Sequence, residues 1–341
     1  MKHIFLVHSH TLFLTALGVI EHENITKNDV LFIFSRNYHN ILPFDYESYD
    51  MSKEVEDTFY IMLSWSRRHF WYNHSQRDKC VKLFDDFIEA HASEGFLLYV
   101  CQLQAFANQI LATNPKCKEC FFIQEGGRVM TPDLTGNIKW FCKLYNYIFL
   151  HNENRIWKMT NWFPNAHTPY NKPITAYAFD KSYFGNAPQK TIMVKWPKLR
   201  LDIGINPHYP IFLTEGAVEL GQIDAPLYEK SLKKLIEEFS GEHNYIKFHP
   251  KNSEQAKSKY ISYFIELGKT VEELPMDVPF EMILTNFEGL HLFGFGTSLL
   301  FYGQALGHKV VSKEEYLLSS ARYRAHVKGL QTLDNASKME L

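Results

Sequence analysis

The chain has 341 residues, of which 45% are hydrophobic and 22% are charged, and its formal net charge is −2. This composition is that of a globular protein with enough apolar residues for two cores, and it excludes an intrinsically disordered chain. The near-neutral charge provides no overall basic field, so we expect no nucleic-acid partner.

The cysteines and the apolar N-terminal stretch narrow the class further. The five cysteines are an odd number with scattered spacing, which argues against a disulfide framework and fits a cytoplasmic protein. Cys117 and Cys120 form a single C-x-x-C without the second ligand pair that zinc usually needs. Residues 4–20 are interrupted by the polar run 8–11 and are short for a membrane span, so they predict a strand, a turn and a helix.

The first half of the chain alternates apolar strands with segments of helical period. Strands are expected at 4–7, 30–34, 96–100 and 120–123, and helices at 12–21, 55–67, 80–92, 104–112 and 136–150. This alternation predicts a mostly parallel sheet with crossover helices. The proline-rich stretch 161–210 predicts loops and a domain junction, with short strands at 176–179 and 191–194.

A second α/β unit is expected from residue 211 onward. Its strands are expected at 211–213, 245–248, 289–295 and 309–311, and its helices at 228–239, 253–267, 279–285, 297–306 and 314–327. We therefore predict an α/β protein with two Rossmann-like domains, 1–208 and 209–312. The segment 313–341 is predicted to contain a C-terminal helix that packs back towards the first domain.

A carboxylate follows the last apolar strand of the first half. Glu125 comes after strand 120–123 and is followed by Gly126 and Gly127, which permit a tight turn. The ends of parallel strands are where α/β sheets bind ligands, and a carboxylate there can take a proton from a sugar hydroxyl. A solvated turn glutamate is the structural alternative.

Two further polar groups follow strands of the second half. His249 and Pro250 end strand 245–248, and an imidazolium there can give a proton to a departing phosphate. Thr297 and Ser298 follow a Gly-x-Gly turn at the start of a helix, where backbone N–H groups and the helix dipole bind phosphate. A strand-end histidine bonded to a carbonyl and an ordinary N-cap are the structural alternatives.

Glu281 falls in the first turn of the short helix 279–285. A carboxylate can accept two hydrogen bonds from a ribose diol, which makes this residue a candidate nucleotide contact. First-turn glutamates are also common as partners of the helix dipole.

In this order, these residues resemble the bacterial sialyltransferases of the GT-B fold, which include the lipooligosaccharide sialyltransferases and the capsular polysialyltransferases. That family has an acidic-acidic-Gly motif, a His-Pro motif and a Ser/Thr-Ser motif. The corresponding residues here are Gln124-Glu125-Gly126, His249-Pro250 and Thr297-Ser298.

Two shorter similarities and one departure accompany these motifs. Phe280-Glu281 is similar to the family's Phe-Glu nucleotide contact, and Ser9-His10, after the first strand, is similar to its N-terminal cleft loop. Gln124 stands where the family has its first acid, which puts in doubt what that position contributes.

The resemblance implies an inverting transfer of sialic acid from CMP-sialic acid to a sugar hydroxyl, on galactose, of a bacterial surface glycan such as lipopolysaccharide or capsule. Glu125 would be the base, and His249 would protonate or stabilise the departing CMP phosphate. Thr297 and Ser298 would hold that phosphate. Since the leaving group is one phosphate and no Asp-x-Asp motif occurs, no metal or other cofactor is expected.

The remaining candidate residues are assigned by the same resemblance and by position. Donor binding is expected from Thr214, Gly216, Lys247, Pro250 and Glu281. Contacts in the cleft, on the acceptor side, are expected from Ser9, His10, Gln124, Gly126 and Gly127.

With the base in the first domain and the acid in the second, the two would cooperate across an interdomain cleft. The enzyme would act in the cytoplasm, in association with the inner membrane. The alternatives are a GT-B transferase that uses CMP-Kdo or a UDP-sugar, and a non-catalytic carbohydrate-binding α/β protein. No motif specifies the linkage, the exact acceptor, single transfer or polymerisation, or the oligomeric state.

Overall fold

The computed structural model describes residues 1–38, 40, 45–63, 70–126, 144, 155–156, 173–185 and 188–327. Its contacts divide the chain into two compact units, one of Met1–Glu125 and Met130–Trp196 and one of Gly126–Val129 and Pro197–Leu341. The main division therefore falls after Trp196, within the proline-rich stretch that predicts a domain junction.

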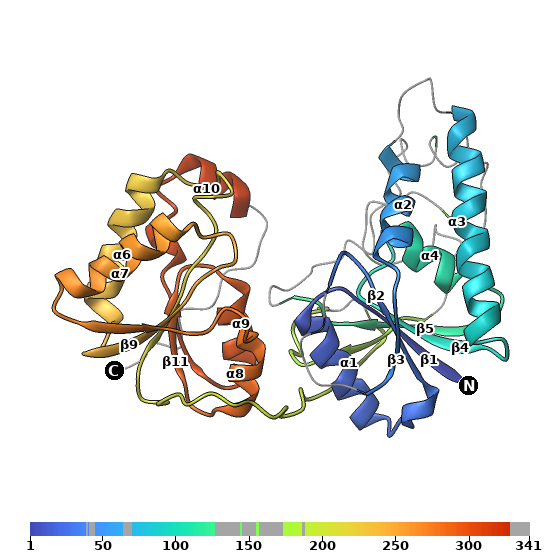
Figure 1. The fold of residues 1–341 in the computed structure, drawn as a ribbon, viewed down its shortest axis with the longest axis horizontal. Coiled ribbons are helices and arrows are strands. Elements are labelled where there is room, and N and C mark those ends of the chain that lie inside the picture. The colour runs from blue at the N-terminus through green and yellow to red at the C-terminus, as the bar shows by residue number, and fades with distance from the viewer. Residues whose placement is uncertain are drawn as a thin grey trace. The chain divides into compact units, whose positions relative to one another are not determined.

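The first unit is built on a parallel sheet. Its strands are β1 (Lys2–Val7), β2 (Val30–Phe34), β3 (Glu47–Asp50), β4 (Phe96–Val100), β5 (Cys117–Ile123), β6 (Thr175–Ala178) and β7 (Lys190–Met193). Within the described residues their order is β3-β2-β1-β4-β5-β6-β7, and every neighbouring pair is parallel. The helices are α1 (His10–His22), α2 (Ser52–Leu63), α3 (Phe70–His91) and α4 (Phe106–Ala112), with a 3-10 turn η1 (Lys27–Asp29). Helices α2, α3 and α4 lie on one side of the sheet and α1 on the other (Figure 1).

Alternate apolar residues of the inner strands fill both faces of this sheet, because successive side chains of a strand point in opposite directions. Ile4 and its strand neighbours pack in one buried cluster with side chains of α3 and α4. Phe5 points the other way and stacks on Phe32 of β2 and Tyr99 of β4, with ring centroids 5.5 and 4.2 Å apart. Phe13 of α1 covers Phe32. Each such buried ring contributes roughly 1.5–3 kcal/mol, so these layers hold the strand ends in place.

The second unit repeats the same plan on a smaller scale. Its strands are β8 (Ile211–Leu213), β9 (His243–Lys247), β10 (Thr270–Glu273), β11 (His291–Gly294) and β12 (Lys309–Ser312). Their order is β10-β9-β8-β11-β12, again with every neighbouring pair parallel. The helices are α6 (Ala225–Phe239), α7 (Glu254–Glu266), α8 (Phe280–Asn286), α9 (Ser298–Ala305) and α10 (Ala321–Val327), with a 3-10 turn η3 (Glu314–Tyr316). Helices α6, α7 and α10 lie on one side of the sheet, and α8 and α9 on the other (Figure 1).

These two doubly wound parallel sheets confirm the predicted α/β class with two Rossmann-like domains. Edge strands β3 and β10 were not predicted, because their sequences, ESYD and TVEE, are mostly polar and exposed. The expected helix 314–327 is two elements, η3 and α10, separated by a turn.

The predicted C-terminal helix is present in part. Within α10, Tyr323 is 2% exposed and belongs to the core of the second unit. Residues 328–341 and most of the expected helix 136–150 lie outside the described residues, so the expected packing of the C-terminal segment on the first domain stays a prediction. Among the described residues, no helix combines the length and the apolar character that crossing a membrane requires.

Each sheet has a topological switch point, where successive connections leave in opposite directions. In the first sheet this point lies between β1 and β4, and in the second it lies between β8 and β11. The crevice outside the carboxyl ends of two such strands is the usual ligand-binding position of open α/β sheets. Each unit therefore offers one such position, and the candidate residues can be judged against it.

Candidate functional site

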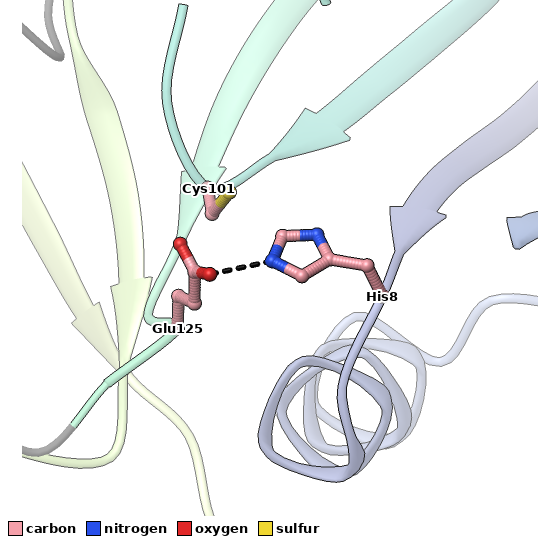
Figure 2. Close-up of side chains that lie close together, drawn as sticks. All are labelled: His8, Cys101 and Glu125. Atoms are coloured by element: carbon pink, nitrogen blue, oxygen red, sulfur yellow. Dashed lines mark hydrogen bonds and ion pairs between the residues drawn. The ribbon is translucent and has the colours of Figure 1, made fainter. Parts of the chain in front are cut away.

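The switch point of the first sheet holds a histidine–carboxylate pair. His8 is the first residue after β1, and Glu125 is the second residue after β5. The Nε2 atom of His8 lies 2.5 Å from Oε1 of Glu125. The two side chains are 9% and 22% exposed, so the pair is shielded from water but reachable at the carboxylate. Figure 2 shows the imidazole aimed at the Glu125 carboxylate.

Cys101 and Arg36 complete the surroundings of Glu125. Cys101 is the first residue after β4, and its thiol sulfur lies within 4.8 Å of the Glu125 carboxylate. The guanidinium of Arg36 lies 4.0 Å from Oε1 of Glu125. Burial works to raise the pKa of Glu125, but the hydrogen bond and charge of His8, the Cys101 thiol and Arg36 outweigh it and lower that pKa. Glu125 is therefore ionised near neutral pH, as a general base must be.

Arg36 lies in a loop with an unusual backbone. Arg36 and Asn37 have φ of 57° and 55°, a left-handed conformation that costs energy in residues other than glycine. The loop is held by Ser52, whose hydroxyl accepts from the Asn37 N–H at 2.8 Å. The strained turn thus places a guanidinium beside the Glu125 carboxylate.

Sequence reasoning missed His8, Cys101 and Arg36. Each lies within two residues of the end of a buried strand, but none of the three belongs to a recognised motif. The signal that finds His8 and Cys101 is the strand order, because the first residues after the two switch-point strands face the same crevice.

The predicted cleft residues of the first unit take different places. Ser9 is the N-cap of α1, with its hydroxyl accepting from the Leu12 N–H at 3.3 Å, and His10 Nδ1 lies 3.0 Å from the Tyr38 hydroxyl. Gln124 is fully buried and its side-chain oxygen accepts from the N–H groups of two residues after β6, Phe179 and Asp180, at 3.1 and 3.0 Å. Its side chain therefore ties β5 to the loop after β6.

Of the two glycines after Glu125, only the first is described. Gly126 is half-buried directly beyond the carboxylate-bearing residue, and Gly127 lies outside the described residues. The predicted cleft role of Gly127 stays a prediction.

The switch point of the second sheet opens into a cavity of about 250 Å³. Four predicted residues from three separate segments line it together: Gly216, His249, Thr297 and Ser298. The cavity lies at the small end of ligand pockets, which span about 300–1,000 Å³. It can hold part of a nucleotide, such as a phosphate with its sugar.

His249 is held in one orientation by its neighbours. Its backbone N–H donates to the Thr214 hydroxyl at 2.7 Å, and its Nδ1 accepts from the Lys251 N–H at 3.1 Å. Because Nδ1 accepts a hydrogen bond, the proton of the neutral ring is on Nε2. Burial lowers the pKa of His249, with Glu219 opposing and Lys251 adding to the decrease. His249 therefore offers a neutral Nε2–H donor at physiological pH.

Gly216 makes room for this histidine. A Cβ atom at Gly216 would lie 2.6 Å from Nδ1 and 2.9 Å from Cε1 of His249, far inside normal contact distance. The absence of a side chain at Gly216 is therefore what allows the imidazole to lie against the strand end. This gives Gly216 a positioning role.

A buried polar network supports the same strand ends, and sequence reasoning found only part of it. Thr214 donates to Oδ1 of Asn252 at 2.6 Å, and Nδ2 of Asn252 donates to the Glu215 carbonyl at 3.0 Å and to Glu219 at 3.2 Å. Thr214 and Asn252 are 2% and 6% exposed. Thr214 thus positions the backbone of His249, and Asn252, three residues after His249, was not predicted.

The turn before α9 presents a donor to an oxygen anion. The Gly296 N–H donates to Oε1 of Glu215 at 2.5 Å. Thr297 is the N-cap of α9 and its hydroxyl accepts from the Leu299 N–H at 3.4 Å, while Ser298 is exposed at the first helical position. Glu215, which stands between the predicted donor residues Thr214 and Gly216, lines the cavity. Its carboxylate marks the position that this turn offers to an anion.

Four predicted donor residues, Thr214 among them, lie outside the residues that line this cavity. The ammonium of Lys247 donates to the Pro275 and Val278 carbonyls, and burial lowers its pKa, partly offset by Glu281. Lys247 therefore fixes the segment that leads into α8. Glu281 lies in the first turn of α8, and Pro250 is exposed.

Comparisons with known proteins give structural likeness without sequence kinship. A scan against protein-family models finds no match, and neither does a search of curated proteins. Among solved structures, the spinosyn rhamnosyltransferase SpnG complexed with thymidine diphosphate is 9% identical, with a TM-score of 0.48 over 92% of this chain and 80% of that one.

Two further solved structures give similar values. The UDP-GlcNAc 2-epimerase of Methanocaldococcus jannaschii is 10% identical, with a TM-score of 0.43 over 94% of this chain and 88% of that one. A trehalose-6-phosphate structure from E. coli bound with UDP-2-fluoro glucose is 8% identical, with a TM-score of 0.42 over 99% and 92%. At such low similarity we base the functional assignment on the residues of this chain.

Together, the described residues provide two groups that can take part in a reaction, one in each unit. The first unit provides an ionised, mostly buried carboxylate held by an imidazole, which suits proton abstraction. The second provides a cavity with a fixed imidazole N–H and a helix N-terminus, which suits an oxygen anion.

Proposed function

We propose that this protein is an inverting sialyltransferase that moves sialic acid from CMP-sialic acid to a galactose hydroxyl of a bacterial surface glycan. The observation that carries the proposal is the cavity at the second switch point. Gly216, His249, Thr297 and Ser298 come from three distant segments, yet all four line it. The family resemblance implies His249 for the leaving phosphate and Thr297 and Ser298 for holding it, and Gly216 was assigned to donor binding by its position.

In the proposed reaction one bond forms and one breaks in a single displacement. The acceptor oxygen attacks the anomeric carbon of sialic acid as its proton passes to Glu125. The bond from that carbon to the CMP phosphate oxygen breaks, and its electron pair leaves with the phosphate. The transition state has oxocarbenium character, as in other glycosyl chemistry.

His249 then acts on the leaving group as a hydrogen-bond donor. Its Nδ1 is occupied by the Lys251 N–H, so its Nε2–H is the atom that reaches a phosphate oxygen. Its lowered pKa favours stabilisation by the neutral ring over full proton transfer. Thr297 and Ser298, at the start of α9, add donors at a helix N-terminus, where the dipole favours negative charge.

His8 supports Glu125 in this scheme. Its Nε2–H, 2.5 Å from the carboxylate, holds one oxygen and leaves the other to face the acceptor. His8 is therefore a positioning residue for the base.

We expect Glu281 to bind the ribose of the donor and no metal to be required, since one phosphate leaves. The nucleotide sugar places the reaction in the cytoplasm, with association at the inner membrane where the glycan is built.

The proposal is tested by incubating the protein with each of several nucleotide sugars and with a set of glycan acceptors. We expect acceptor-dependent release of CMP from CMP-sialic acid, with a sialylated product whose linkage is then mapped. Turnover with CMP-Kdo or a UDP-sugar alone would show that the donor is that nucleotide sugar and not CMP-sialic acid. Glycan binding without turnover of any donor would overturn the assignment in favour of a carbohydrate-binding protein.

A further inference from the structure

His8, Cys101 and Glu125 bring three metal-ligand atoms to one point. They come from the carboxyl ends of three adjacent strands, β1, β4 and β5 (Figure 2). The ligand atoms, one imidazole nitrogen, one thiol sulfur and one carboxylate oxygen, all lie within 4.8 Å of one another. Because each ligand is anchored at the end of a core strand, the set is held by the sheet itself.

The donor set suits zinc more than magnesium or calcium. Zinc takes nitrogen at about 2.0–2.1 Å, sulfur at about 2.3 Å and oxygen at about 2.0–2.2 Å, which puts tetrahedral ligand atoms about 3.3–3.7 Å apart. The present His8–Glu125 separation of 2.5 Å needs an opening of less than about 1 Å, within the reach of a glutamate side chain. Thiolate and imidazole are soft ligands that hard cations avoid.

We propose that His8, Cys101 and Glu125 form a zinc-binding site with three protein ligands and one open coordination position. On binding, the Cys101 thiol loses its proton to solvent. The proton of the neutral His8 ring moves from Nε2 to Nδ1 through solvent, so the His8–Glu125 hydrogen bond is exchanged for two metal bonds. The half-exposed side chain of Arg36, 46% accessible, can turn away from the added charge.

Occupancy of this site removes the lone pairs that a base uses. Zinc bound to the Glu125 carboxylate therefore competes with proton abstraction, so the metal acts as an inhibitor of the proposed transfer. Metal binding can be tested separately, since it does not depend on the transfer reaction.

The chain provides a matched control in its C-x-x-C pair. Cys117 and Cys120 are both buried in the core of the first unit, and within the described residues they belong to no group of three ligands. A thiolate signal that is lost on substitution of Cys101 and kept on substitution of Cys120 therefore assigns the metal to the proposed site.

Cobalt(II) titration of the full, metal-free, reduced chain tests the site without any substrate. We expect about one equivalent of Co²⁺ to give the visible bands of a tetrahedral centre and a near-ultraviolet thiolate-to-cobalt band, both bleached by Zn²⁺ and unaffected by Mg²⁺. Cys101→Ser removes the thiolate band, Glu125→Gln weakens cobalt binding by at least ~10-fold as loss of a ligand predicts, and Cys120→Ser leaves both unchanged.

Thermal unfolding of each variant confirms that it is folded before titration. The proposal is overturned if the wild type gives no thiolate band, if the band persists in Cys101→Ser, or if it disappears in Cys120→Ser. Glu125→Gln keeps the test informative if Cys101→Ser does not fold, because unchanged cobalt affinity in that variant also contradicts the site.

Discussion

At the residue scale, Glu125 owes its chemistry to its neighbours. Burial alone raises a carboxyl pKa, yet His8, Cys101 and Arg36 together lower that of Glu125. The ionised carboxylate is thus more stable in the folded chain than in the unfolded one.

This lowered pKa predicts how stability depends on pH. A group whose pKa is depressed by folding stabilises the fold above its unfolded value, here 4.5, and loses that contribution as the pH falls through its folded value. Urea unfolding is therefore expected to show Glu125→Gln less stable than the wild type near pH 7, with the difference shrinking below pH 4.5. A difference that grows on acidification would contradict the interpretation of the pair.

Gly216 provides a second test at this scale. In Gly216→Ala the new Cβ would fall 2.6 Å from Nδ1 of His249, so the ring must leave its position and lose the Lys251 hydrogen bond. We expect the chain to fold and transfer to fall by about 10²-fold, as misplaced groups of this kind cause. The control is Gly204→Ala, where a Cβ meets no atom within 4 Å. Equal kinetics for the two variants would remove His249 from the mechanism.

At the element scale, strand ends decide what the site contains. The first residues after β1 and β4 are His8 and Cys101, and those after β8 begin with Thr214 and Glu215. Their backbones are fixed by parallel ladders and by hydrogen bonds between neighbouring loops. The Thr214–Asn252 pair is one such link, between the loops after β8 and β9.

Asn252→Asp tests that link with little change of shape. The change removes the amide donor to the Glu215 carbonyl and sets a carboxylate against Glu219. A buried group left without its partner costs about 1–3 kcal/mol, so we expect that loss in the free energy of unfolding, measured in urea. Ser253→Ala, at the exposed N-cap of α7, is expected to cost less, about 1 kcal/mol. If Asn252→Asp leaves the free energy of unfolding unchanged, the network does not hold the loop.

The elements also show what the sequence can and cannot predict. Inner strands such as β2 and β11 are apolar runs, because both faces of a parallel sheet are covered, and the sequence predicts them. Edge strands β3 and β10 lack that signal. Glu125, His249 and Thr297 could be named from motifs, whereas His8 and Asn252 become visible only when the strand order and the loop contacts are known.

At the scale of the whole molecule, each unit carries one switch point and one part of the proposed chemistry. CMP is expected to bind the second unit alone, since the cavity is lined by residues of that unit. Hydrogen exchange with CMP at about 100 times its Kd is expected to protect β8, β11 and α9 by up to about 2.7 kcal/mol. Exchange in β1 and β5 is expected to stay the same, and protection confined to those strands would place the nucleotide elsewhere.

The central claim is that Glu125 and His249 act on one transfer reaction. The most direct test is acceptor-dependent CMP release by Glu125→Gln and His249→Ala, with Glu119→Gln and His208→Ala as exposed controls. We predict that each site variant folds as the wild type does and loses about 10²–10⁴-fold in rate, while both controls keep it. Near-normal transfer by a folded Glu125→Gln or His249→Ala variant would contradict the account.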